Sequence, residues 1–169
     1  MGSVTQAWVD GSCLNNGVSG ASSAIGVYYG PEDPRNFSSK LSGLKQTNNK
    51  AELLAVLYVL STNLLTSGLR VYTDSQYSIK CLTEYHHKWR LNGWVTSKGD
   101  AVESVDIIKY ALDLLTRRSV TGSYTGLCYV KGHADNVGNN AADRLANAAA
   151  HSTVERGRLK LLCHFGVPF

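Results

Sequence analysis

Hydrophobic residues along this chain fall into two kinds of run. Short apolar runs end at glycine, proline or asparagine, as Ala24–Tyr29 does at Gly30-Pro31, and such runs predict β-strands. Longer runs that are apolar on nearly every side, such as the one beginning at Ala51, predict helices. The expected strands are 4–10, 24–29, 35–41, 69–73 and 124–130, and the expected helices are 51–67, 76–84, 102–117 and 139–150.

The links between these elements predict how the strands are arranged. The first three strands are joined by short, turn-rich segments, which favour antiparallel hairpins. A helix capped by Thr47 or Asn48 then separates the third strand from 69–73. A strand, a crossover helix and a second strand favour parallel pairing, so 69–73 is expected to run parallel to the first strand. The pattern therefore predicts an α/β fold.

Four acidic residues stand out in this arrangement. Asp10 and Asp74 follow the apolar stretches of two strands that are expected to be neighbours, so both should lie at one edge of the sheet. Glu52 is the only charge on an apolar helix, and Asp143 lies near the start of the alanine-rich last helix. An ionised carboxylate in apolar surroundings costs many kcal/mol unless something compensates it, and a metal cation often does so.

Each acid also has a purely structural explanation. Glu52 could favour the positive end of its helix dipole, Asp74 could cap the following helix, and Asp143 could pair with Arg144 or Arg117. Their combination favours a shared site, because clustered carboxylates raise one another's pKa and a divalent ion relieves the repulsion. Magnesium prefers oxygen ligands, and two such ions can serve a phosphoryl displacement.

Composition limits the classes of protein to which the chain could belong. Its 169 residues are 43% hydrophobic and 18% charged, which is typical of one globular domain. The net charge of +4 permits a polyanionic partner without demanding one. Four scattered cysteines without a C-x-x-C pair argue against a zinc site and favour free thiols in a reducing compartment. With no signal-like start and no long apolar run, we expect an intracellular protein, cytoplasmic or nuclear, without a membrane partner.

Five sequence blocks, in this order, resemble type 1 ribonuclease H over about residues 6–150. They are Asp10-Gly11-Ser12, 47–53 (TNNKAEL), 73–77 (TDSQY), 130–134 (VKGHA) and 139–146 (NNAADRLA). The resemblance implies a ribonuclease H-like fold, a five-stranded mixed sheet of three antiparallel and then two parallel strands flanked by helices. It also implies a catalytic domain over 1–151, followed by a tail, 152–169, to which we assign no role.

The resemblance further implies endonucleolytic cleavage of the RNA strand in RNA–DNA hybrids, leaving 3′-hydroxyl and 5′-phosphate ends. Two Mg²⁺ ions, with Mn²⁺ as a substitute, would be held by Asp10, Glu52, Asp74 and Asp143. His133 lies in a glycine-flanked loop, and histidine is the side chain whose unperturbed pKa, about 6.5, lies nearest to neutral pH. We therefore expect it to move a proton near the leaving group, or to help the product depart, as a catalytic residue less essential than the acids.

Residues expected to contact the substrate follow from the same match. Amide side chains can both donate to and accept from the 2′-hydroxyl, which distinguishes RNA from DNA. The amides are Asn16, Asn48 and Gln76, and the backbone of Cys13, Leu14 and Asn15 would lie beside them. A phosphate pocket for the DNA strand would be formed by Lys45, Thr47 and Ser104. DNA sugars or bases would pack on Tyr77, Tyr85 and Trp89, and Ser75 is the last predicted substrate contact.

The chain departs from the family pattern in places. The segment Trp89–Thr96 carries few positive charges where the family usually has a lysine-rich protrusion, and Ser104 stands where asparagine is common. We expect no separate hybrid-binding domain before Val4, and we expect a monomer. Two alternatives remain open at this point: a non-catalytic nucleic-acid-binding domain, and the ribonuclease H domain of a retroelement polymerase.

Overall fold

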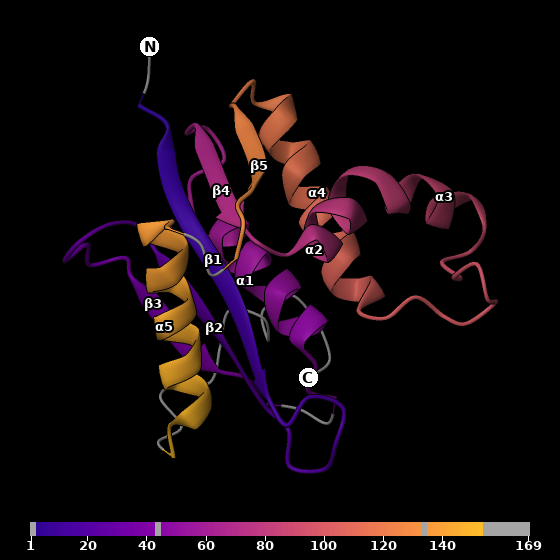
Figure 1. The fold of residues 1–169 in the computed structure, drawn as a ribbon. Coiled ribbons are helices and arrows are strands. Elements are labelled where there is room, and N and C mark those ends of the chain that lie inside the picture. Colours follow the sequence, from indigo (N-terminus) through magenta and orange to yellow (C-terminus); the bar gives the residue numbers. More distant parts are fainter. Residues whose placement is uncertain (1–2, 43–44, 133–134, 154–169) are drawn as a thin grey trace.

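A computed structural model describes residues 3–42, 45–132 and 135–153. Among these residues, no helix is both long and apolar enough to cross a lipid bilayer. The strands are β1 (Thr5–Leu14), β2 (Ser22–Tyr28), β3 (Phe37–Lys40), β4 (Leu69–Thr73) and β5 (Thr125–Tyr129). The helices are α1 (Asn48–Thr62), α2 (Gln76–Lys80), α3 (His86–Leu91), α4 (Val105–Val120) and α5 (Val137–His151), with a π-helical segment, η1 (Cys81–Tyr85), between α2 and α3 (Figure 1).

The five strands form one mixed sheet in the order β3-β2-β1-β4-β5. β1 pairs antiparallel with β2, and β2 pairs antiparallel with β3. β4 runs parallel to β1, and β5 runs parallel to β4, because a helical crossover precedes each of them. The predicted α/β class and strand directions are confirmed.

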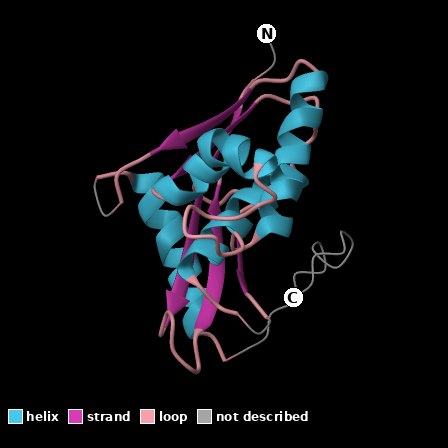
Figure 2. Cartoon of the chain, turned by 90° about the vertical axis from the view of Figure 1, so that its right-hand side faces the viewer, coloured by secondary structure: helices cyan, strands magenta, loops and turns pink. Residues whose placement is uncertain are grey.

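Helices cover both faces of the sheet: α5 lies across one face, and α1 lies against the other with α4 beside it (Figures 1 and 2). Two glycines permit this close packing. A Cβ atom added to Gly26 of β2 would meet the backbone of α5 at Ala142 and Ala146. A Cβ atom added to Gly11 of β1 would meet the backbone of α1 at Glu52. Both helices therefore contact the strands directly, near the position of Asp10.

The core lies between the sheet and the α1–α4 pair. Helix α1 is buried on nearly every side, which explains its continuous apolar sequence: Ala51, Leu53, Leu54, Ala55, Val56, Leu57, Val59 and Leu60 are all at most 2% exposed. Thr47 caps the helix, because its Oγ1 accepts a hydrogen bond from the backbone N–H of Lys50 at 3.3 Å. Of the two predicted caps, the structure selects Thr47.

Several element boundaries differ from the prediction. Helix α1 ends at Thr62, well before Gly68, because Asn63 adopts an extended backbone and its Nδ2 donates to the carbonyl of Val59 at 2.9 Å. The helix predicted to stop at residue 84 continues through η1 into α3. Helix α4 begins three residues later than expected, because Ser104 has a φ of +57° and cannot be helical.

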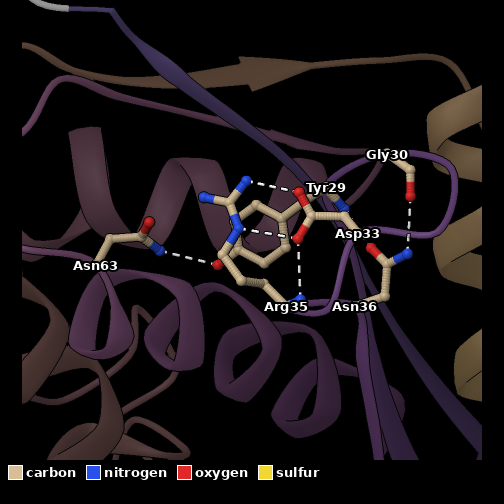
Figure 3. Close-up of polar contacts among 6 residues, drawn as sticks. All are labelled: Tyr29, Gly30, Asp33, Arg35, Asn36 and Asn63. Carbon is tan, nitrogen blue, oxygen red and sulfur yellow. Dashed lines mark hydrogen bonds and ion pairs between the residues drawn. The ribbon is translucent and has the colours of Figure 1, made fainter.

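The connection between β2 and β3 is held by polar contacts (Figure 3). Arg35 lies over the ring of Tyr29, with 4.4 Å between its Cζ and the ring centroid, and forms an ion pair with Asp33 at 2.7 Å. The Oδ1 of Asn36 accepts a hydrogen bond from the Tyr29 backbone N–H at 2.7 Å. Asn63 Nδ2 donates to the Tyr29 hydroxyl at 2.8 Å, so this connection is tied to the end of α1.

Candidate active site

Asp10 lies within β1 rather than at its end. β1 continues to Leu14 as a partner of β2, with Asp10 opposite Gly26, whereas its pairing with β4 stops at Trp8 opposite Tyr72. The prediction that the strand ends at Asp10 is therefore wrong, because the antiparallel partner extends further than the parallel one. Asp74 follows β4 directly, and the two-residue offset from the last parallel pair puts it level with Asp10.

Glu52, on helix α1, places its carboxylate next to those of Asp10 and Asp74. One side-chain oxygen from each of Asp10, Glu52 and Asp74 lies within 4.8 Å of the others. Glu52 is not in the first turn of α1, so the helix-dipole explanation loses its basis. Only 6% of Asp10 and 5% of Glu52 is exposed, so both carboxylates are largely removed from water.

The cluster is electrostatically unfavourable without a cation. Burial, followed by the neighbouring charges of Asp74 and Asp143, raises the pKa of Asp10 to about 8. Burial, Asp10 and Asp74 also raise the pKa of Glu52 well above its usual value, although the Gly11 backbone N–H and the Asn48 side chain partly oppose this. Glu52 Oε2 is buried and has no hydrogen-bond partner among the described residues. A set of oxygen donors with one buried, unsatisfied oxygen fits a hard divalent cation such as Mg²⁺.

Two asparagines of α5 hold the outer acids, and sequence reasoning missed both. Asn139 is buried and donates from Nδ2 to Asp74 Oδ2 at 3.1 Å, while Asn147 donates from Nδ2 to Asp143 Oδ1 at 2.8 Å. The spacing of four residues between Asn139, Asp143 and Asn147 places them on one face of the helix and was the available signal. Asp74 does not cap α2, because Ser75 fills that role.

The acids line an open cleft of about 600 Å³. Six of the predicted substrate-contacting residues line it with them: Cys13, Leu14, Asn48, Ser75, Gln76 and Tyr77. The cleft also contains Ser12, Asn49 and Asn147, which were not predicted. Asn16 lies beside this group, since its Oδ1 accepts from the Asn48 backbone N–H at 3.2 Å, and the exposed Asn15 has a φ of +53°.

The remaining predicted contacts lie outside this cleft. Lys45, Thr47 and Ser104 line a separate cavity of about 300 Å³, in which Lys45 forms an ion pair with Glu103 at 2.6 Å. Tyr85 and Trp89 contact each other, with ring centroids 5.5 Å apart, and Trp89 packs partly against the core. The predicted substrate residues thus form three groups.

His133 and most of the predicted tail lie outside the described residues. The residue before His133 is described: a Cβ atom added to Gly132 would meet Oδ2 of Asp74, so the backbone there lies directly against that carboxylate. The loop therefore approaches the acid cluster up to its last described residue, and the role of His133 stays a prediction.

Comparison with known proteins places this chain in a family. The RNase H family model matches residues 3–151. The chain belongs to the RNase H family. Among relatives of this RNase H chain, "Ribonuclease H" of Schizosaccharomyces pombe is 45% identical over 144 residues, which cover 85% of this chain and 52% of that protein. "Ribonuclease H1" of Mus musculus is 37% identical and covers 89% of this chain and 51% of its own length. This RNase H chain thus spans about half the length of these two curated relatives.

A bacterial relative is matched almost completely. "Ribonuclease H" of Methylobacillus flagellatus is 37% identical, over 90% of this chain and 95% of that protein. Among solved structures, a foamy viral protease-reverse transcriptase in complex with RNA/DNA hybrid has a TM-score of 0.70 at 23% identity, over 86% of this chain and 20% of that one. LC9-RNase H1 has a TM-score of 0.57 at 24% identity, over 92% and 77% of the two chains. These two structures support the fold assignment of this chain.

Proposed function

We propose that this chain is a ribonuclease H that hydrolyses the RNA strand of RNA–DNA hybrids and leaves 3′-hydroxyl and 5′-phosphate ends. The observation that carries the proposal is the group of three carboxylates, Asp10, Glu52 and Asp74, whose oxygens lie within 4.8 Å of one another in an open cleft. The presence of these carboxylates argues against a non-catalytic nucleic-acid-binding domain, because clustered, buried negative charge next to phosphates would not help such a domain to bind.

Four acids would hold two Mg²⁺ ions, or Mn²⁺ in their place: Asp10, Glu52, Asp74 and Asp143. When bound, these ions supply the positive charge that favours attack by water and stabilises the phosphate and the leaving 3′-oxygen. The residues of the chain provide the oxygen ligands and, through the hydrogen bonds from Asn139 and Asn147, orient the outer two of them. His133 would deliver or accept a proton at the leaving oxygen.

Recognition of the RNA strand would use the amides beside the cleft. Gln76 is exposed at the start of α2, and the contact between Asn48 and Asn16 brings the first turn of α1 next to the β1–β2 turn. These amides are suited to a 2′-hydroxyl, which both donates and accepts. The DNA strand would lie across Tyr77, Tyr85 and Trp89, with one of its phosphates near Lys45, Thr47 and Ser104. Because every one of these groups comes from a single chain, a monomer suffices.

A cleavage assay tests this function. We expect cleavage of an RNA–DNA duplex in Mg²⁺, with no cut in RNA–RNA or DNA–DNA duplexes of the same sequence, and we expect Asp74→Asn to remove the activity. End-labelled products treated with a phosphatase or a 5′-kinase would identify the ends. Binding of the hybrid without cleavage in Mg²⁺ or Mn²⁺ would instead support the non-catalytic alternative.

A further inference from the structure

The side chain of Asn147 connects β1 to the outermost acid of the site. The hydroxyl of Ser12, two residues after Asp10, donates to Asn147 Oδ1 at 2.6 Å. Asn147 Nδ2 then donates to Asp143 Oδ1 at 2.8 Å. Ser12 is buried, and Asn147 lines the cleft, so this chain of hydrogen bonds runs along the wall of the proposed active site.

An amide is well suited to this position. Asp143 needs a donor and Ser12 needs an acceptor, and a neutral amide offers both from one rigid plane. The two contacts also fix which way the amide faces, since Nδ2 must point to the carboxylate and Oδ1 to the hydroxyl. A hydrogen bond to an ionised carboxylate is roughly twice as strong as one between neutral groups, so Asp143 is restrained where it would otherwise rotate.

Asp143 needs this restraint more than the other acids do. Asp10 and Glu52 are buried, and Asp74 is held by Asn139, whereas Asp143 is half-exposed and lies outside the group of three close carboxylates. Among the described residues, the Asp143 side chain is held by its hydrogen bond from Asn147. A ligand that must be ordered upon ion binding weakens that binding by the cost of its ordering.

We propose that Asn147 is a positioning residue that holds Asp143 ready for a divalent ion and thereby sets the concentration of Mg²⁺ that the enzyme requires. This inference rests on the proposed function. Groups that orient metal ligands typically change metal affinity or activity by about 10–100-fold when removed. A purely structural role would look different, because an amide–carboxylate pair four residues apart contributes only slightly to helix stability and would leave metal binding unchanged.

The test compares Asn147→Leu with the unmodified protein, because leucine is close in size and removes both hydrogen bonds. Two quantities are measured: Mn²⁺ binding by calorimetry without nucleic acid, and the Mg²⁺ dependence of single-turnover cleavage. We expect weaker Mn²⁺ binding and an increase of about 10-fold or more in the Mg²⁺ concentration for half-maximal rate. Saturating Mg²⁺ should restore most of the rate, and hybrid affinity in Ca²⁺ should change less than twofold.

Two further variants complete the test. Ala148→Leu places the same side chain on the exposed side of α5 and should leave both titrations unchanged. Ser12→Ala removes only the hydrogen bond to Asn147 Oδ1 and should raise the Mg²⁺ concentration for half-maximal rate by a smaller factor, about threefold. If Asn147→Leu does not fold, the comparison of Ser12→Ala with the unmodified protein tests the proposal instead.

The outcomes separate this inference from the proposed function. Coinciding metal titrations for Asn147→Leu and the unmodified chain would overturn it. So would a loss of rate that saturating Mg²⁺ does not reverse while Mn²⁺ binding stays the same, since that would make Asn147 a substrate contact or a structural residue. An unmodified protein that cleaves no hybrid, or an Asp143→Asn variant that cleaves normally, would instead contradict the proposed function.

Discussion

Asp10 lies where burial and two neighbouring acids favour its protonated form. Its pKa of about 8 in the folded protein lies above the ordinary value of 3.8. Between those values the folded state binds a proton that the unfolded chain has released, so the stability of the metal-free protein falls as pH rises. Each pH unit in that window lowers the free energy of unfolding by at most ~1.4 kcal/mol. We therefore expect the melting temperature in EDTA to fall by several degrees from pH 5 to pH 8.5.

Substitution of Asp10 tests both the electrostatics and the chemistry. Asp10→Asn should abolish cleavage, melt higher than the unmodified protein at pH 8 in EDTA, and show a flatter dependence on pH. Mg²⁺ should stabilise the unmodified protein more than the variant. Comparable turnover by Asp10→Asn would contradict the metal assignment, whereas a lower melting temperature would contradict only the argument from repulsion.

His133 is predicted to act on a proton near the leaving group. Replacing it with alanine should lower the cleavage rate by about 10- to 1,000-fold without changing which strand is cut, because a general acid or base typically contributes about 10²–10⁴-fold and product release contributes less. The exposed His151 in the last turn of α5 provides the control, since His151→Ala should retain the rate. Equal steady-state and single-turnover rates for all three proteins would make His133 an ordinary loop residue.

At the scale of elements, the closeness of α5 to the sheet decides where Asp143 lies. Because a Cβ on Gly26 would meet the backbone of α5, Gly26→Ala must push the helix away from β2. Overpacking of this kind costs about 1–3 kcal/mol, or roughly 3–10 °C in melting temperature for a chain of this size. Cleavage should fall as well, because Asp143 and both positioning asparagines lie on the displaced helix.

Gly20 in the β1–β2 turn provides the matched control. It has a φ of +80° and open space around the position of a Cβ atom, so Gly20→Ala should cost about 1 kcal/mol through backbone strain alone. Its cleavage rate should stay close to that of the unmodified chain. A stable, fully active Gly26→Ala variant would show that α5 tolerates displacement and that activity does not depend on its position against β2.

The sequence predicted the existence and type of the elements better than their ends. The apolar run of α1 and the two candidate caps, Thr47 and Asn48, are local signals, and they were sufficient to predict the helix. The end of α1 depends on the side-chain amide of Asn63, and the continuation of the helix through η1 depends on packing. The spacing of apolar residues along the sequence reveals neither feature. Asp10 was expected at a strand end because the prediction followed only the apolar residues of β1. The strand continues beyond them because it pairs with β2 as far as Leu14.

The same contrast applies to the candidate site. The four acids could be named from the conjunction of motifs, since each motif is local and their order is informative. The spacing of Asn139 and Asn147 places them on the helix face of Asp143, but their roles could not be predicted, because these depend on which side chains the tertiary fold brings within hydrogen-bond distance. The ion pair between Lys45 and Glu103 was equally hidden, since it joins residues 58 positions apart in the sequence.

At the scale of the whole molecule, the distribution of charge governs how strongly a duplex binds. The net charge of +4 is modest. Near Tyr85 and Trp89, the exposed cations of α3 are Lys88 and Arg90, followed by Leu91, which is 90% exposed. In the second cavity, Glu103 already neutralises Lys45. Few phosphates are therefore expected to be neutralised when the hybrid binds.

Salt dependence of hybrid binding measures this number directly. The logarithm of the binding constant falls against the logarithm of salt concentration with a slope of about −0.9 per neutralised phosphate. We expect a shallow slope of about −2 to −4, measured by titration in Ca²⁺, an ion chosen to support binding while disfavouring cleavage. A much steeper slope would mean that the basic surface lies elsewhere, for example on Arg156, Arg158 and Lys160, which are outside the described residues.

Adding one charge at each of two exposed apolar positions locates the binding surface. Leu91→Lys places a cation beside the aromatic residues predicted to grip the DNA strand, so it should tighten binding and steepen the slope by about 1. Val120→Lys adds the same charge at the C-terminal end of α4, where 83% of Val120 is exposed, and should have little effect. Single-turnover cleavage at saturating enzyme should be unchanged in both. Equal tightening by the two lysines would show that net charge alone attracts the hybrid, and the aromatic segment would then lose its assignment as the DNA-strand contact.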